Sequence, residues 1–326
     1  MEFQNIKIKK EPIKKYLNSM TIKYKIDNDN ILYNKLRLFG DEFVKNNKDK
    51  CFIIVDGKMQ QLTSHIIINE KMRYEVFIEI KLQEIQTITN MSQMFCRGIG
   101  EEDRMLLISI PNIYNWETRY VTDMSYLFCG CEELESLPDI SSWNTSKVKD
   151  FSNMISYFWN LETLSDISNW DTSNVVNMSH MFENNWRLKS LPNISKWNTS
   201  KVEDMEHMFT RCFTLEIMPD ISKWDVRNVK NMSYMFSICK NLEYIPDISI
   251  WKIKSIINLR GMFFMCINLK HLPNISKWKI NEIEQLLYIF TECYNADNLE
   301  YEIKKIFQKY NDILEVQLDI WFKLHN

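Results

Sequence analysis

Hydrophobic and polar positions along this chain follow one block that occurs seven times without a change in its length. Each block contains one tryptophan at the same place, and the seven residues, evenly spaced along the chain, are Trp116, Trp143, Trp170, Trp197, Trp224, Trp251 and Trp278. Sequence periods in the twenties are typical of solenoids, in which each block forms one coil that packs on the next. The period therefore predicts a stack of coils with the tryptophans buried between them.

The other hydrophobic positions keep the same register. A β-branched residue follows each tryptophan after five positions, and then comes Met-x-x-Met-Phe or a related apolar set, as in Met178, Met181 and Phe182. This spacing of three and four predicts a short helical turn. Residues 242–248 and their equivalents predict one short parallel strand per coil. Prolines late in this segment lack an amide donor and should keep the strand short; they are Pro192, Pro219, Pro246 and Pro273.

The two ends of the chain depart from the repeat. Residues 1–82 contain four runs rich in β-branched and aromatic residues, at 21–26, 35–39, 51–55 and 74–82, and Asp56-Gly57 is a hairpin signal. Residues 297–326 carry apolar residues on one helical face, although 316–322 also alternates like a strand; the apolar residues are Ile303, Ile306, Phe307, Tyr310, Ile313 and Leu314. We expect a β-rich capping module at 1–82, an α/β repeat solenoid at 83–296 and a C-terminal capping helix at 297–326.

Composition narrows the function classes. The chain has 40 basic and 43 acidic residues, a net charge of −3, so it lacks the basic stripe that a nucleic-acid-binding surface requires. No segment reaches the roughly 18 consecutive apolar residues of a membrane span. The first thirty residues lack the apolar core of a signal peptide, and the lysines near the start, such as Lys9 and Lys10, predict a solvated, flexible terminus. These features predict a cytoplasmic protein without a membrane span.

The cysteines agree with this location. Five of the eight cysteines share one repeat column with Phe158 and Asn185, which indicates a buried apolar position instead of a disulfide framework; they are Cys131, Cys212, Cys239, Cys266 and Cys293. Glycosylation sequons at Asn177 and Asn231 lie beside the predicted core, where a glycan would conflict with packing.

Residues 167–182, Ile-Ser-Asn-Trp-Asp-Thr-Ser-Asn-Val-Val-Asn-Met-Ser-His-Met-Phe, and the Cys-x-Asn-Leu that follows Met235-Phe236 resemble the BspA-like branch of leucine-rich repeats, also known as a mycoplasma-type repeat family of unknown function. The resemblance covers roughly residues 83–296 and implies a right-handed, leucine-rich-repeat-like solenoid that binds other macromolecules. Bacterial members are often surface proteins or adhesins. This chain has tryptophan where the family usually has phenylalanine, and it shows no export signal or wall anchor, which weighs against adhesion.

Two sets of side chains are candidates for partner contact. The first lies between the core methionines and should face solvent, where tyrosine is favoured at binding hot spots; it comprises Tyr126, His180, His207, Tyr234 and Tyr288. Scattered surface aromatics without a role are the alternative. The second set lies on the predicted strand side, where variable residues would determine specificity, and comprises Glu243, Tyr244, Lys270 and His271.

The sequence gives weaker support to a catalytic function of the repeat. Asp139, Asp166, Asp220 and Asp247 share a column with Asn193 and Asn274, and neighbouring carboxylates about 5 Å apart would suit a retaining glycosidase. The exchange of Asp for Asn favours a turn-stabilising role instead. Cys212 near His207 suggests a Cys–His dyad, but Cys212 should face the core. Cys129-Gly-Cys131 has no second ligand pair at zinc spacing, and six glycines form no phosphate loop.

We therefore predict a non-enzymatic, intracellular scaffold or recognition protein that binds a protein partner along its coils, with no catalytic residue, cofactor or metal site. The alternatives are a cell-surface adhesion or host-interaction protein and, supported only by the aspartate row, a carbohydrate-active solenoid enzyme.

Overall fold

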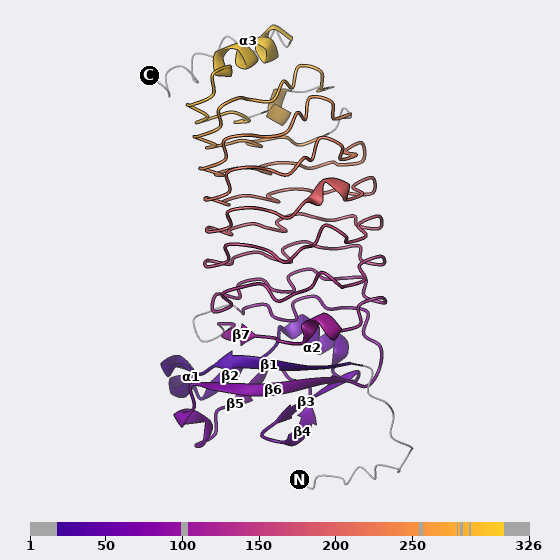
Figure 1. Cartoon of the computed structure of the whole chain (residues 1–326), viewed down its shortest axis with the longest axis vertical. Coiled ribbons are helices and arrows are strands. Elements are labelled where there is room, and N and C mark those ends of the chain that lie inside the picture. The colour runs from indigo at the N-terminus through magenta and orange to yellow at the C-terminus, as the bar shows by residue number, and fades with distance from the viewer. Residues whose placement is uncertain are drawn as a thin grey trace.

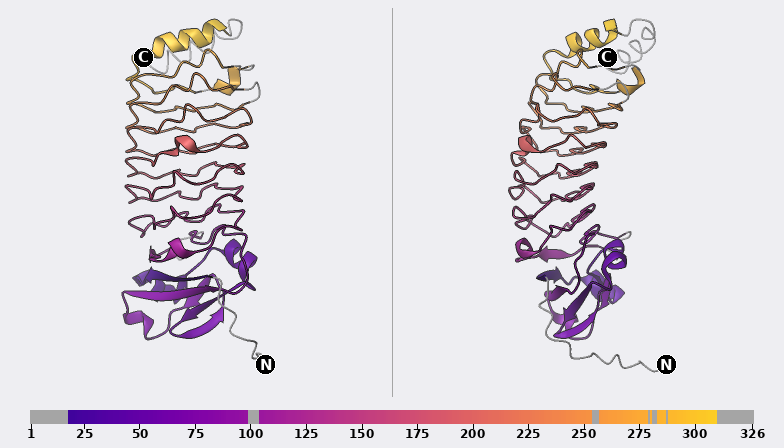
Figure 2. Two further views of the ribbon diagram at one scale, coloured as in Figure 1. Left: turned by 45° about the vertical axis from the view of Figure 1, so that its right-hand side comes forward. Right: turned by 90° about the vertical axis from the view of Figure 1, so that its right-hand side faces the viewer.

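The computed structural model describes residues 18–98, 104–253, 257–278, 280, 283–286 and 288–309. A small β-sheet module lies at one end, a stack of coils follows, and helix α3 lies over the last coil (Figures 1 and 2). The lysines predicted to form a flexible start, the β-branched position Ile256 and the alternating segment 316–322 lie outside the described residues.

The N-terminal module is built on an antiparallel five-stranded sheet with the order β4-β3-β6-β1-β7, beside a two-stranded sheet of β2 and β5. The strands are β1 (Ser19–Lys25), β2 (Lys35–Arg37), β3 (Cys51–Val55), β4 (Lys58–Gln61), β5 (His65–Ile67), β6 (Phe77–Glu84) and β7 (Leu107–Ser109). Short helices connect them: α1 (Asn28–Tyr33), α2 (Asp41–Asn47) and η1 (Met72–Tyr74). The β-rich character expected for this region is confirmed.

Alternation along β1 explains how the sheet forms its core. Met20, Ile22 and Tyr24 are fully buried, whereas the residues between them are half-buried. Asp56 and Gly57 both have positive φ, of 47° and 72°, in the turn that joins β3 to β4. Two positive φ values are the geometry of the tight hairpin turn that the Asp-Gly pair predicted.

The module also closes the first coil. Phe39 packs against Phe95 in a tilted arrangement with ring centroids 6.0 Å apart, and Phe95 stacks on Phe128 at 5.7 Å, so the aromatic column of the coils begins inside the module. Gly40 donates its amide to Gln93 O at 3.1 Å, and a Cβ at this position would lie 2.1 Å from that oxygen. Close packing of module and coil therefore requires glycine here.

The seven repeated tryptophans are buried, each with 1–4% of its surface exposed. From Trp143 onward, each indole Nε1 donates to the carbonyl of an isoleucine in the preceding coil, as Trp197 does to Ile167 O at 3.1 Å. Trp116, the first of the column, has no such partner among the described residues. The indole rings therefore both fill the core and connect each coil to the preceding one.

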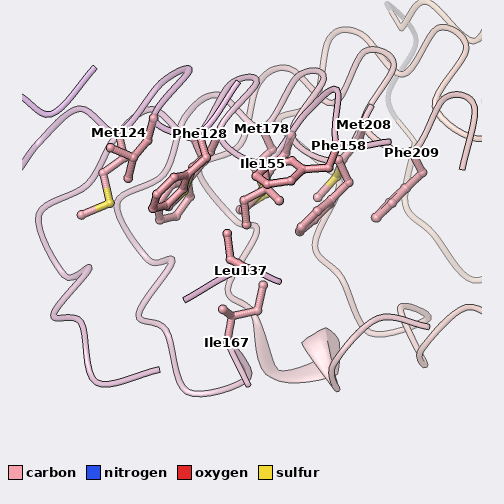
Figure 3. Close-up of a cluster of buried hydrophobic side chains, with 14 of the residues drawn as sticks. Met124, Phe128, Leu137, Ile155, Phe158, Ile167, Met178, Met208 and Phe209 are labelled. Atoms are coloured by element: carbon pink, nitrogen blue, oxygen red, sulfur yellow. The ribbon is translucent and has the colours of Figure 1, made fainter. Parts of the chain in front are cut away.

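The core between the coils is filled by the other repeated columns. Figure 3 shows Met124, Phe128 and Phe158 pointing into a common interior, with Leu137 and Ile167 approaching from the opposite side of the coils. Phe182, Phe209, Phe236 and Phe263 stack in sequence at 5.4–5.6 Å. In the cysteine column, Cys212 donates its thiol to Phe182 O at 3.2 Å, and all eight cysteines are free and buried.

The secondary structure predicted for each coil is wrong in two places. Residues 242–248 form no strand; the segment contributes one isolated parallel bridge, between Ile217 and Tyr244. The Met-x-x-Met-Phe segment is not helical, because its amides donate to the next coil, as Met178 N does to Asp204 O and His180 N to Glu206 O. Positive φ at His180 and Asn184, of 57° and 59°, interrupts any extended run.

Pairing between coils therefore lies in the segment expected to be helical. Isolated parallel bridges join equivalent Asp and Asn residues, from Asn90–Asp123 through Asn231–Asn258. In the described parts of the coils, the other regular elements are short: η3 (Ile113–Asn115), η4 (Ile194–Lys196) and η5 (Ile283–Leu286). Helix α3 (Leu299–Lys309) follows the last coil, where Leu299 packs against the core cluster and Ile303 is buried. Tyr310, Ile313 and Leu314 of the predicted helix lie outside the described residues.

We predict that Trp197→Ala lowers the free energy of unfolding by about 3–5 kcal/mol, because a buried aromatic ring is replaced by a cavity. The matched control is Trp186→Ala, since Trp186 is 41% exposed and should lose at most about 1.5 kcal/mol. Urea unfolding of both variants checks this, and equal losses would contradict the assignment of the repeated tryptophans to the core.

Candidate recognition surface

The predicted row of tyrosines and histidines occupies a column with left-handed backbone. Tyr126, His180, His207, Tyr234 and Tyr288 have φ between 53° and 60°. From Tyr126 to Tyr234, each backbone amide of this row donates to a carbonyl of the following coil. His207 N, for example, donates to Ser233 O at 3.0 Å. These bonds compensate for a conformation that costs energy in residues other than glycine. The side chains consequently point outward at half-buried or exposed positions.

Three members of the row form a continuous stack. His180 stacks on His207 at 4.9 Å between ring centroids, and His207 stacks on Tyr234 at 5.0 Å. Beyond Tyr234 the column contains Gly261, where a Cβ would lie 2.4 Å from the Tyr234 ring. Arg260 bridges this coil, because its Nε donates to the Tyr234 hydroxyl at 3.0 Å and its guanidinium lies 4.9 Å from the Tyr288 ring. Tyr126 stands apart, separated from His180 by Asn153.

The two histidines have different electrostatic surroundings. Burial opposes charge on His180, but its Nδ1 lies 2.7 Å from Glu183 Oε2, and this hydrogen bond with the charges of Glu183, Glu206 and Asp204 raises the His180 pKa. Burial and the neighbouring charge of His180 lower the His207 pKa. The stacked pair therefore favours the state in which only His180 is protonated over the state in which both histidines are protonated.

The second predicted set lies on other parts of the coils. Lys270 Nζ forms an ion pair with Glu243 at 2.6 Å and lies 5.3 Å from the Tyr244 ring. His271 Nδ1 lies 2.8 Å from Asp297, and its Nε2 is 3.3 Å from Asn298 Nδ2. Lys270, Glu243 and Tyr244 thus contact one another across neighbouring coils, whereas His271 contacts residues outside the set, and among the described residues no hydrogen bond, ion pair or ring contact joins any of them to the histidine stack.

The catalytic alternatives find little support in the geometry. Asp220 and Asp247 each accept hydrogen bonds from the hydroxyl and the amide of a serine two residues later, Ser222 and Ser249, and these hydrogen bonds lower both aspartate pKa values. A glycosidase acid requires the opposite shift. The Cys212 thiol is fully buried, and burial raises its pKa well above the ordinary value, which disfavours the thiolate that a nucleophile requires.

Sequence reasoning missed a second aromatic stack. Trp159 stacks on Trp186 at 5.7 Å, Trp186 stacks on Phe213 at 5.7 Å, and Lys240 lies 5.4 Å from the Phe213 ring. We call Trp159, Trp186 and Phe213 the aromatic ladder. Both tryptophans are 41% exposed. The signal was present in the sequence, because these two tryptophans are also one repeat apart but occupy a later position in the repeat than the core column.

Exposed cations border the aromatic ladder. Arg187 contacts the side-chain oxygen of Asn160 at 3.4 Å, and Arg211 contacts that of Asn184 at 3.5 Å. In the part of the chain that the structure describes, neither these two arginines nor Lys240 forms an ion pair with a carboxylate. Asn184 also accepts from Trp186 Nε1 at 3.4 Å, which links the ladder to the coil segment that carries His180.

A known family covers most of this architecture. The family described as "Mycoplasma protein of unknown function, DUF285" matches residues 69–158, 89–215, 150–247 and 213–317. The chain belongs to this family. The predicted resemblance to a mycoplasma-type repeat family of unknown function is thereby confirmed, and the repeats described above are DUF285 units. No curated protein and no solved structure matches the chain. Among the described residues, no helix has the length and apolar character needed to span a bilayer.

We predict that His180 titrates above and His207 below the ordinary histidine pKa of 6.5, measured by NMR of the ring protons. A raised folded-state pKa means that the His180 contribution to stability is present below pH 6.5 and disappears as the pH rises through the folded value. Glu183→Gln should lower the His180 pKa, whereas Glu243→Gln should leave it unchanged. A His180 value that does not respond to Glu183→Gln would contradict this electrostatic account.

Proposed function

We propose that this DUF285 protein is a non-enzymatic scaffold that binds a protein partner along one face of its coils. The observation that supports this most is the aromatic ladder, in which two tryptophans are exposed on neighbouring coils. Solvent-exposed tryptophan is costly to leave uncovered, and tryptophan, tyrosine and arginine are the residues most enriched at binding hot spots. The histidine and tyrosine row on the same coils would extend the contact.

The rigidity of the surface favours binding. Tyr157, beside the ladder, donates its amide to Glu183 O at 2.8 Å, and Asn184 donates to Thr210 O at 2.9 Å. The exposed side chains therefore stand on backbone that is tied to the neighbouring coils. A partner that binds such a surface loses little energy to ordering it.

Charge and ring geometry favour a protein partner with acidic side chains. Arg187, Arg211 and Lys240 would supply cations to its carboxylates. Nucleic acid is disfavoured, because bases stack on ring faces. Both faces of Trp186 are covered, by Trp159 and Phe213.

In this proposal the coils are a variant of the leucine-rich-repeat-like solenoid, in which turns and isolated bridges replace the usual strand. The proposal also includes a cytoplasmic location, supported by eight buried free thiols. A cell-surface adhesion protein is the alternative, and a carbohydrate-active enzyme would depend on the exposed aspartates that stabilise turns.

The proposal is tested with the double variant Trp159→Ser/Trp186→Ser and the control Tyr301→Ser, an exposed tyrosine on α3. Partners are first identified by proximity labelling in the native cell, and their affinity is then measured with purified proteins. Loss of one aromatic hot spot costs at least about 2 kcal/mol, so we expect Kd to increase at least about thirtyfold in the double variant. Tyr301→Ser should bind like the parent.

Several outcomes would contradict the proposal. Equal affinity of the parent and the double variant would remove the ladder from the interface. Association that is lost on nuclease treatment would indicate nucleic acid. Protease-accessible protein on intact cells would favour adhesion, and hydrolysis of a glycan that is abolished by Asp220→Asn or Asp247→Asn would favour the enzyme.

A further inference from the structure

His180, Glu183 and His207 form a cluster of potential metal ligands. One ring nitrogen from each histidine and one carboxylate oxygen lie within 4.8 Å of one another. His180 Nδ1 is already 2.7 Å from Glu183 Oε2. The cluster joins two coils, because the histidines occupy equivalent positions in successive repeats.

The backbone holds these three residues in place. His180 N donates to Glu206 O at 2.7 Å and His207 N donates to Ser233 O at 3.0 Å, both at positive φ. The Glu183 side chain is 11% exposed, whereas the histidine side chains are 30% and 25% exposed. The carboxylate therefore forms the base of the cluster, and the two rings form its solvent-facing side.

The surroundings would also orient the second ring. His207 Nδ1 lies 3.0 Å from Thr210 Oγ1, and its Nε2 lies 3.7 Å from Glu206 Oε1. Hydroxyl and carboxylate neighbours of this kind orient metal-binding histidines and increase their basicity. Glu206 lies beside this ring but is not one of the three residues whose ligand atoms lie close to one another.

Two histidines and one glutamate are a ligand set that zinc prefers. Zinc sites with three protein ligands leave a fourth position open, with metal–ligand distances of about 2.0–2.2 Å. Ligand atoms in such a tetrahedron are about 3.4 Å apart, so the widest separation must shorten by about 1.4 Å. Rotation of two partly exposed rings, which now stack in parallel, supplies this movement. Calcium and magnesium require more oxygen ligands than the cluster offers.

The equivalent positions of other coils do not contain this combination of two histidines and one glutamate. The column of His180 and His207 contains Tyr126, Asn153, Tyr234, Gly261 and Tyr288 in other coils. The column of Glu183 contains Cys129, Ser156, Thr210, Ser237 and Phe264. Turn geometry alone therefore requires neither histidine nor glutamate at these positions.

We propose that His180, Glu183 and His207 bind one zinc ion per chain, with an open coordination position facing solvent. Neither the aromatic ladder nor its arginines supplies a ligand, although His180 and His207 belong to the row that would extend the proposed partner surface. An open position on the same coils could accept a donor atom from a partner, but the zinc site does not depend on one.

The test uses the full chain without an affinity tag, freed of metal by a chelator and then dialysed. Isothermal titration with zinc chloride should show one site, and magnesium or calcium chloride should show none. His207→Gln and Glu183→Gln should each weaken zinc binding by more than about tenfold, since even changes outside the ligand shell cost about 10–100-fold. The matched control His271→Gln removes a histidine that pairs with Asp297 outside the cluster and should bind zinc like the parent.

Cobalt substitution separates a ligand role from a structural one. Cobalt bound to the parent should show the visible absorption of a tetrahedral site, and this absorption should disappear in both ligand variants while their circular dichroism and melting temperature remain close to those of the metal-free parent. Absence of zinc binding by the parent would overturn the proposal. So would binding that His207→Gln and Glu183→Gln leave intact, or that His271→Gln removes.

Discussion

The fold depends on buried hydrogen bonds that only a neighbouring coil can accept. The indole of Trp170 donates to Ile140 O, and the hydroxyl of Thr172 donates to Asn198 O in the opposite direction along the stack. Both donors lie in nearly water-free surroundings, where an unpaired polar group costs about 1–3 kcal/mol. A coil that shifted against its neighbour would lose such bonds at every repeated position. Hydrogen bonding therefore determines the register, and the apolar columns supply the energy of burial.

This division explains which parts of the fold could be predicted from the sequence. The repeat length, the buried tryptophans and the buried cysteine column follow from periodicity, because apolar residues at a fixed interval must share one environment. The internal path of the coil could not be read in this way. The spacing of Met178, Met181 and Phe182 is the same for a helix and for a series of turns with positive φ at His180 and Asn184. The choice depends on amides that bond to the next coil, and their partners lie almost a whole repeat away in sequence.

The candidate surface was predictable to a similar degree. The outward direction of His180 and His207 followed from their place between core methionines, but Glu183 was overlooked because its column contains serine, threonine and cysteine in other coils. Trp159 and Trp186 were overlooked because they lie outside the column of seven tryptophans that defines the repeat. Positions that depart from the repeat pattern are the better candidates for a specific function, since packing already explains the positions that keep it.

The contacts between coils have a consequence for the dimensions of the molecule. In a solenoid, each internal coil packs against the coil before it and the coil after it. Insertion or removal of a whole coil would therefore change only the surroundings of the coils on either side of it, provided that the exchanged segment has the full length of one repeat. Such changes would lengthen or shorten the molecule in steps of about 4.8 Å, the distance between paired backbones. The distance along the stack between two surface features would then change by a whole number of such steps.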